Sequence, residues 1–105
     1  MSFEAIFIAS DYVDLSTQNK VISCFESKET FQVIERRVSN EQSTHVYSYA
    51  GIQREDRPED FYVSLEQKEV YLCFYSATTE QQSRITHFLA ECLHEAGIQG
   101  DFEEL

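Results

Sequence analysis

The sequence predicts an α+β fold in which a mainly antiparallel sheet carries two amphipathic helices on one face, as a two-layer sandwich. Segments in which apolar and polar residues alternate, typical of strands, fill the middle of the chain. Segments with apolar residues three and four positions apart, typical of helices, lie near its two ends. Since 105 residues suffice for one hydrophobic core, residues 1–105 are expected to form a single domain.

The first elements are a strand and a helix. Residues 3 to 9 have apolar side chains on both faces, which is typical of a central strand. A helix is expected over residues 16 to 27, where apolar residues have helical spacing. Ser16 is the preferred N-cap, and Asp14 is the alternative.

A strand from 31 to 38 follows. Its alternation places Phe31 and Val33 on one face and Ile34 and Val38 on the other. The polar residues after it predict a turn.

Three more strands are predicted before the last helix. Residues 44 to 52 form one of them, and the charged segment 53 to 60, which contains a proline, is a loop. Residues 61 to 65 and 70 to 77 then form a hairpin around a polar turn at 66 to 69. The apolar residues that share one face of this hairpin are Phe61, Val63, Leu65, Val70, Leu72 and Phe74.

The last helix has clear signals at both ends. Thr78 and Gln81 have the spacing of a capping box, and Gly97 with Ile98 is typical of a Schellman end. Residues 100 to 105 either add a short edge strand or remain a tail. The element order is therefore β-α-β-β-β-β-α, with or without a final strand. One apolar stripe runs along the helix: Ile85, Phe88, Leu89, Cys92, Leu93 and Ala96.

Both helices need the same sheet face, so the opposite face, which we call the open face, is left without a helix. Residues 44 to 50 alternate too weakly to assign, so His45, Tyr47 and Tyr49 are also candidates for it. A partner protein, a second copy of the chain, or the strand propensity of tyrosine alone would each account for such a face. The residues expected on the open face are Tyr62, Tyr71, Cys73 and Tyr75.

The charge balance limits the partners. Eight basic and 19 acidic residues give a formal net charge of −11, which repels phosphate backbones and anionic lipid. We therefore expect no nucleic-acid or membrane partner. A basic protein partner fits this charge, and solubility alone is the competing explanation.

The lack of a targeting signal and the spacing of the cysteines both indicate a reducing cytoplasm. The chain has no stretch of 18 apolar residues and no signal-peptide layout, and a cytoplasmic protein is expected. Cys24, Cys73 and Cys92 are too widely spaced for a disulfide framework or a zinc site, so free thiols are expected.

No catalytic or cofactor motif is found. His87, Glu91 and His94 lie on one side of the last helix, but no other sequence feature supports a metal site there. Neighbouring carboxylates in the loops are typical of solvated surface, and three glycines leave no phosphate-binding loop. We expect no metal, no cofactor and no enzymatic activity.

In size, acidity and element order the chain resembles the small acidic immunity proteins of bacterial toxin–immunity pairs. The resemblance concerns general form and transfers no individual residue. It implies an inhibitor that binds one toxin domain, often a basic nuclease, and blocks its active site.

The leading hypothesis is thus a non-catalytic, immunity-type protein-binding module that acts as a monomer or homodimer. The alternatives are a ligand-binding or enzymatic domain with a helix–sheet pocket near His45 or His87, and a homodimeric structural protein. In the leading hypothesis tyrosines anchor the partner and carboxylates meet its lysines and arginines. The residues expected to bind are Tyr47, Tyr49, Asp56, Glu59, Asp60, Glu66, Glu69, Tyr71 and Tyr75.

Overall fold

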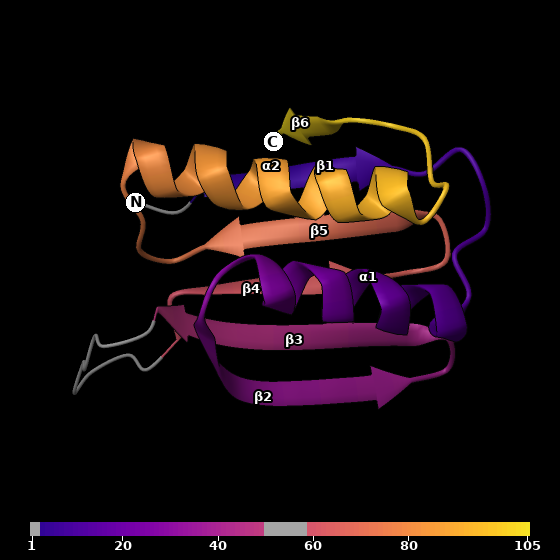
Figure 1. Ribbon diagram of the computed structural model, residues 1–105, viewed down its shortest axis with the longest axis horizontal. Helices are drawn as coiled ribbons and strands as arrows, with labels where there is room; N and C mark the ends of the chain where they lie inside the picture. Colours follow the sequence, from indigo (N-terminus) through magenta and orange to yellow (C-terminus); the bar gives the residue numbers. More distant parts are fainter. Residues whose placement is uncertain (1–2, 50–58) are drawn as a thin grey trace.

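An antiparallel sheet forms one layer of the molecule, and helices cover one of its faces (Figure 1). The computed structural model describes residues 3–49 and 59–105; within them the sheet has six strands and carries two helices. The strand order β2-β3-β4-β5-β1-β6 has only antiparallel neighbours, which confirms the predicted α+β sandwich. The elements are β1 (Phe3–Ile8), α1 (Leu15–Lys28), β2 (Phe31–Ser39), β3 (Gln42–Tyr49), β4 (Phe61–Leu65), β5 (Glu69–Phe74), α2 (Thr79–Glu95) and β6 (Phe102–Glu104).

The core lies between the helices and the sheet. The apolar residues predicted to share one face of the β4–β5 hairpin do so, and they are at most 1% exposed. Phe25 of α1 packs onto them, with its ring centroid 6.2 Å from that of Phe61 and 5.7 Å from that of Tyr47. Loss of such a buried ring costs about 3–5 kcal/mol of folding free energy, so these contacts fix α1 on the sheet.

Helix α1 begins one residue earlier than predicted. Asp14, not Ser16, is the N-cap, because its Oδ1 accepts a hydrogen bond of 2.8 Å from the Thr17 amide. This bond lowers the pKa of Asp14, as expected for a carboxylate that satisfies a free amide at a helix start. The preference for Ser16 was wrong.

Both predicted ends of α2 are confirmed. The Thr78 side chain accepts from the Gln81 amide, and the Gln81 side chain accepts from the Thr78 amide. At the other end the Ile98 amide donates to the Leu93 carbonyl across Gly97, whose φ is +85°. Strand β6 then pairs with β1, so residues 102–104 form an edge strand.

A β-bulge changes the faces of β2. The pairing with β3 shifts between Val33 and Glu35, which leaves Ile34 beside Glu35 on the open face. Val38 is consequently paired with Ser43 on the helix side and is 61% exposed at the sheet edge. The prediction that Ile34 and Val38 share a face was therefore wrong.

Candidate functional site

The open face holds three of the predicted tyrosines. Leu72 and Phe74 point into the core, so Tyr71 and Cys73 lie on the opposite side of β5. Tyr62 pairs with Cys73, and its ring centroid is 5.9 Å from that of Tyr75. The three tyrosines are half-buried, whereas Cys73 is only 5% exposed. The predicted open face is thus confirmed for these residues.

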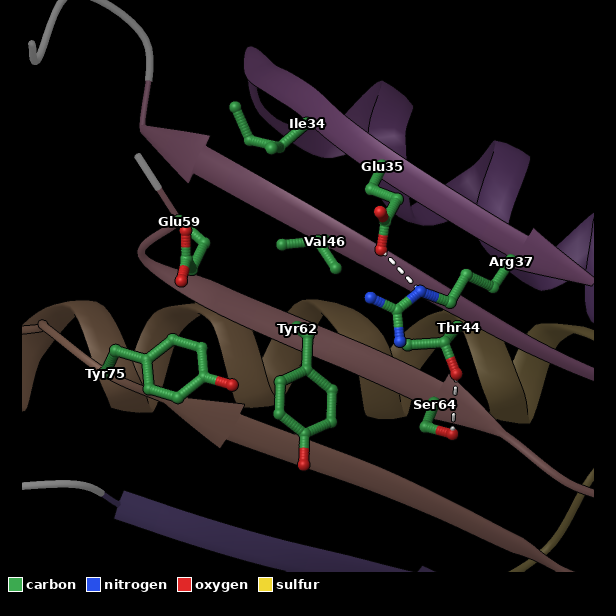
Figure 2. Close-up of a pocket in the computed structure, with 9 residues that line it drawn as sticks. All are labelled: Ile34, Glu35, Arg37, Thr44, Val46, Glu59, Tyr62, Ser64 and Tyr75. Carbon is green, nitrogen blue, oxygen red and sulfur yellow. Dashed lines mark hydrogen bonds and ion pairs between the residues drawn. The ribbon is translucent and has the colours of Figure 1, made fainter. Parts of the chain in front are cut away.

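A broad hollow of about 580 Å³ lies on the open face over strands β2, β3 and β4 (Figure 2). Its floor is formed by β3 and β4, and its walls come from β2 and from the residue that follows β5. Its volume lies within the range of ligand-binding pockets. The lining residues are Ile34, Glu35, Arg37, Thr44, Val46, Glu59, Tyr62, Ser64 and Tyr75.

Charged and polar groups border the hollow on two sides. Arg37 Nε is 2.5 Å from Glu35 Oε2, so the one cation among the lining residues is already paired. On the floor, the hydroxyls of Thr44 and Ser64 are 3.2 Å apart across the strands. Glu59 lies beyond them, on the side of Tyr75 (Figure 2). The second carboxylate therefore stands on the side away from the guanidinium.

Burial determines which groups on this face are ionised. It raises the pKa of Tyr62 to about 12, with smaller contributions from the Cys73 and Tyr75 side chains. Burial, followed by the charge of Glu4, also raises the pKa of the Cys73 thiol. At neutral pH both groups keep their protons, so Cys73 is unsuited to nucleophilic chemistry and the phenol is a hydrogen-bond donor.

Asp60 is a buried structural residue, and its prediction as a partner-binding carboxylate is corrected. It is 1% exposed, and its Oδ2 accepts from the Tyr49 amide at 2.8 Å. Its carbonyl accepts from the amides of Tyr75 and Ser76, at 2.8 and 3.2 Å. Asp60 therefore joins the end of β3 to the segment after β5 and positions Tyr75 beside the hollow.

The other predicted carboxylates lie apart from one another. Glu59 precedes β4 and lines the hollow, whereas Glu66 follows β4 and lies with Glu69 at the opposite end of the sheet. There both belong to a smaller depression of about 370 Å³ between two hairpin turns. Asp56 lies outside the described residues. Among the described residues, the predicted carboxylates thus do not form one continuous rim around the tyrosines.

Tyr47 and Tyr49, the two tyrosines left as candidates for the open face, lie under the helices, so their prediction as partner-binding residues was wrong. The Tyr47 ring is fully buried, and its hydroxyl donates to Glu26 Oε2 of α1 at 2.7 Å. The Tyr49 hydroxyl donates to the Ser76 carbonyl at 3.2 Å. Both tyrosines use their polar ends to close the core rather than to contact a partner.

His45 belongs to a hydrogen-bonded network beneath α1. Arg36 Nη1 donates to His45 Nδ1 at 2.8 Å, which leaves Nε2 to donate to Ser43 Oγ at 3.1 Å. Ser43 then donates to Gln18 Oε1, and Gln18 Nε2 donates to the Val13 and Glu41 carbonyls. Both ring nitrogens are therefore engaged, and His45 is 3% exposed. The helix–sheet pocket proposed around it as an alternative is filled by these side chains.

Of the three residues considered for a metal site on α2, His87 and Glu91 contact each other, whereas His94 binds elsewhere. His94 Nε2 donates to the Gly100 carbonyl at 2.8 Å, while His87 Nε2 is 3.4 Å from Glu91 Oε2. In the described part of the chain, no group of three or more His, Cys, Asp and Glu side chains has metal-binding geometry. His87 also borders a groove of about 550 Å³ between α2 and β6, a second depression on the surface.

Most of the hollow's lining was missed by sequence reasoning. Its β2 and β3 residues could not be assigned, because small, polar and apolar side chains occur on both faces of β3 and the bulge in β2 has no sequence marker. The weak alternation at 44 to 50 was the available signal, and it was compatible with either orientation. The missed lining residues are Ile34, Glu35, Arg37, Thr44, Val46 and Ser64.

The open face thus combines aromatic rings, a polar floor and two carboxylates around one hollow. Such a surface can bind a group that is partly apolar and carries positive charge. In residues 3–49 and 59–105, no helix is long and apolar enough to cross a bilayer. No protein-family model matches the chain, and no curated protein sequence is significantly similar to it.

Proposed function

We propose that this protein is a non-catalytic binding module whose open face holds a cationic segment of a basic partner protein. The hollow between Tyr62, Tyr75 and the carboxylates of Glu35 and Glu59 is the observation that carries this proposal. A lysine or arginine of the partner would lay its methylene groups against the rings and direct its charge toward a carboxylate.

The charge of the open face supports a cationic partner. By register Glu4, Glu35 and Glu103 lie on this face, and Glu59 lines its hollow. Arg37 is the one cation on the strands of this face within the described residues, and it is paired with Glu35. With a net charge of −11 for the chain, a positive protein is attracted at long range and an anionic one is repelled.

The tyrosines of the open face indicate that the partner is a protein rather than a small ion. Tyrosine combines a large apolar area with a polar end and few rotatable bonds, and it is enriched at the energetic centres of interfaces. Tyr62 and Tyr75 border the hollow, and Tyr71 extends the aromatic surface along β5 toward β1. A contact across these strands has the breadth of a peptide segment or a small domain.

Within this class, we propose an immunity-type inhibitor that neutralises a basic toxin domain in the cytoplasm. The acidity, the small α+β form and the hydrogen-bonded strands under the open face support this narrower proposal. An inhibitor of this kind needs a preformed surface that fits over an active site, and a sheet face loses little entropy on binding.

Affinity capture from the source organism tests the proposal. Tagged wild-type protein is expected to retain one basic protein in stoichiometric amount. The Tyr71→Ala/Tyr75→Ala variant is expected to lose it, because two of the three rings of the open face are removed, one of them at the hollow. Tyr12→Ala is the matched control, since Tyr12 is an exposed tyrosine that contacts Glu41 at the opposite end of the sheet.

The outcomes separate the competing functions. If the double variant retains the same partner and both variants are folded, the open face is excluded as the binding surface. If the capture recovers only the chain itself as a dimer, and the double variant disrupts that dimer, the open face binds a second copy of the chain and not a basic partner. A captured nuclease or other toxin whose activity falls on addition of the protein would support the narrower proposal.

A further inference from the structure

Two cysteines from distant parts of the chain meet where α1 and α2 pack together. Cys24 and Cys92 are 68 positions apart in sequence, and their Sγ atoms are 2.6 Å apart. Both are free thiols. A disulfide bond is about 2.05 Å long, so a displacement of about half an ångström brings the two sulfur atoms to bonding distance. We propose that Cys24 and Cys92 form a reversible disulfide that joins the two helices, with a glutathione-type disulfide as the oxidant.

The surroundings assign different roles to the two thiols. Cys92 is 1% exposed, whereas Cys24 is half-buried and reaches the surface of the helix layer. Cys24 Sγ donates to Glu95 Oε2 at 3.3 Å, and Lys28 Nζ lies 3.7 Å from the other oxygen of that carboxylate. Burial, together with the neighbouring Cys24, raises the pKa of Cys92. Cys24 is therefore the thiol that an external oxidant meets first.

The exchange proceeds in two balanced steps. The Cys24 thiolate attacks one sulfur of oxidised glutathione, which forms a mixed disulfide and releases one glutathione thiolate. Cys92 then loses its proton and attacks Sγ of Cys24, which releases the second glutathione thiolate. The two protein thiols are oxidised by two electrons, two glutathione thiols are formed, and the two protons leave with them. The reverse reaction with excess thiol restores the reduced pair.

The cross-link is independent of the proposed function. The two cysteines lie in the helix layer, and the open face lies on the other side of the sheet (Figure 1). A bond that closes a chain segment of 68 residues restricts the unfolded state strongly while it leaves the sheet unchanged. In a cytoplasmic protein such a pair responds to the thiol–disulfide ratio of the compartment.

Equilibration of the purified protein with oxidised and reduced glutathione tests this inference. Wild type and Cys73→Ser, which keeps the pair, are expected to lose two hydrogen atoms in intact mass. Peptide mapping is expected to recover residues 24 and 92 in one cross-linked peptide. The melting temperature should rise by about 10 °C, and excess dithiothreitol should reverse both changes.

Cys24→Ser is the matched control, since it replaces only sulfur at the half-buried position. It should gain neither the cross-link nor the rise in melting temperature. A glutathione adduct on Cys24 with Cys92 still alkylatable would overturn the inference. So would full alkylation of both cysteines after equilibration under oxidising conditions. If Cys73→Ser fails to fold, the peptide map of the wild type decides between these outcomes.

Discussion

At the scale of single residues, the polar side chains beneath α1 act as one unit because each donor meets an acceptor. Arg36, His45, Ser43 and Gln18 form one hydrogen-bonded chain, and it requires a neutral imidazole whose Nδ1 accepts. Burial, followed by the charge of Arg36, lowers the pKa of His45 to about 4. The unfolded chain takes up a proton near the ordinary value of 6.5. Between these values the unfolded state binds more protons, so stability falls as the pH falls.

A pH series therefore tests this network. We expect His45 to lower the free energy of unfolding by about 2 kcal/mol between pH 6.5 and pH 4. His45→Gln keeps an acceptor and a donor but does not titrate, so its stability should change less over this interval. Urea unfolding of both proteins at successive pH values gives the comparison. Equal slopes for the two proteins would contradict the assignment of a neutral His45.

Glu26 affects the pH dependence of folding stability over a lower pH range than His45 does. Burial of this carboxyl raises its pKa, but hydrogen bonds from Arg36 and Tyr47 outweigh burial, so the pKa lies below its ordinary 4.5. The stability that Glu26 supplies is present above pH 4.5 and is lost as the pH falls through the folded-state pKa. Between pH 6.5 and pH 4.5 the change in stability therefore reports His45 rather than Glu26, and below pH 4.5 the loss from Glu26 adds to it.

Tyr75 and Glu59 of the open face are expected to affect different rate constants of partner binding, namely dissociation and association. With the captured partner, Tyr75→Ala should raise the dissociation rate about tenfold and leave the association rate nearly unchanged. Glu59→Lys should mainly slow association at low salt, by a few-fold, because it reverses a charge beside the hollow. Surface plasmon resonance at two salt concentrations measures both constants.

Asp11→Lys is the control for the charge reversal. It changes the net charge equally, but it lies in the exposed loop between β1 and α1, at the other end of the sheet from Glu59. If Asp11→Lys slows association as strongly as Glu59→Lys does, overall charge rather than the open face controls the encounter.

At the scale of elements, two glycines at the end of the chain have different functions. Gly97 ends α2 with a φ of +85°, and an added Cβ there has no neighbour within 4 Å. At Gly100, with a φ of +145°, an added Cβ lies 2.6 Å from the Ile8 carbonyl oxygen and 2.9 Å from the Phe7 ring. Gly100 therefore permits the chain to pass closely over β1 before β6 begins.

We expect Gly97→Ala to cost about 1 kcal/mol, the penalty of the left-handed backbone alone. Gly100→Ala should cost roughly 3 kcal/mol, because backbone strain and a steric clash act together. Chemical denaturation of both variants measures the difference. Equal losses would show that β6 shifts readily and that its packing on β1 has little influence on stability.

The accuracy of the sequence prediction also depended on the element. The capping box and Schellman end of α2 and the shared apolar face of β4 and β5 were predicted because their signals lie within a few residues. The faces of β3 were not predictable, since Ser43 and His45 are buried only through partners on α1 and β2. Asp60 was misassigned for the same reason: its amide partner on Tyr49 is distant in sequence.

At the scale of the whole molecule, the two faces of the sheet have different roles. One side carries the core, the buried network and the cysteine pair, and the other carries the tyrosines and the hollow. We propose that the second side binds a cationic protein. The acidity of the chain was evident from its composition, whereas the hollow depends on a bulge and on strand register.

Hydroxyl-radical footprinting of the protein, alone and with its captured partner, locates the binding surface. Oxidation of Tyr62, Tyr71 and Tyr75 is expected to fall severalfold in the complex, because the partner excludes water from the open face. Tyr12, exposed at the far end, should be modified equally in both states. Unchanged modification of the three tyrosines, together with protection of side chains on α2 such as Phe88 and His87, would show that the partner binds the helix layer and not the open face.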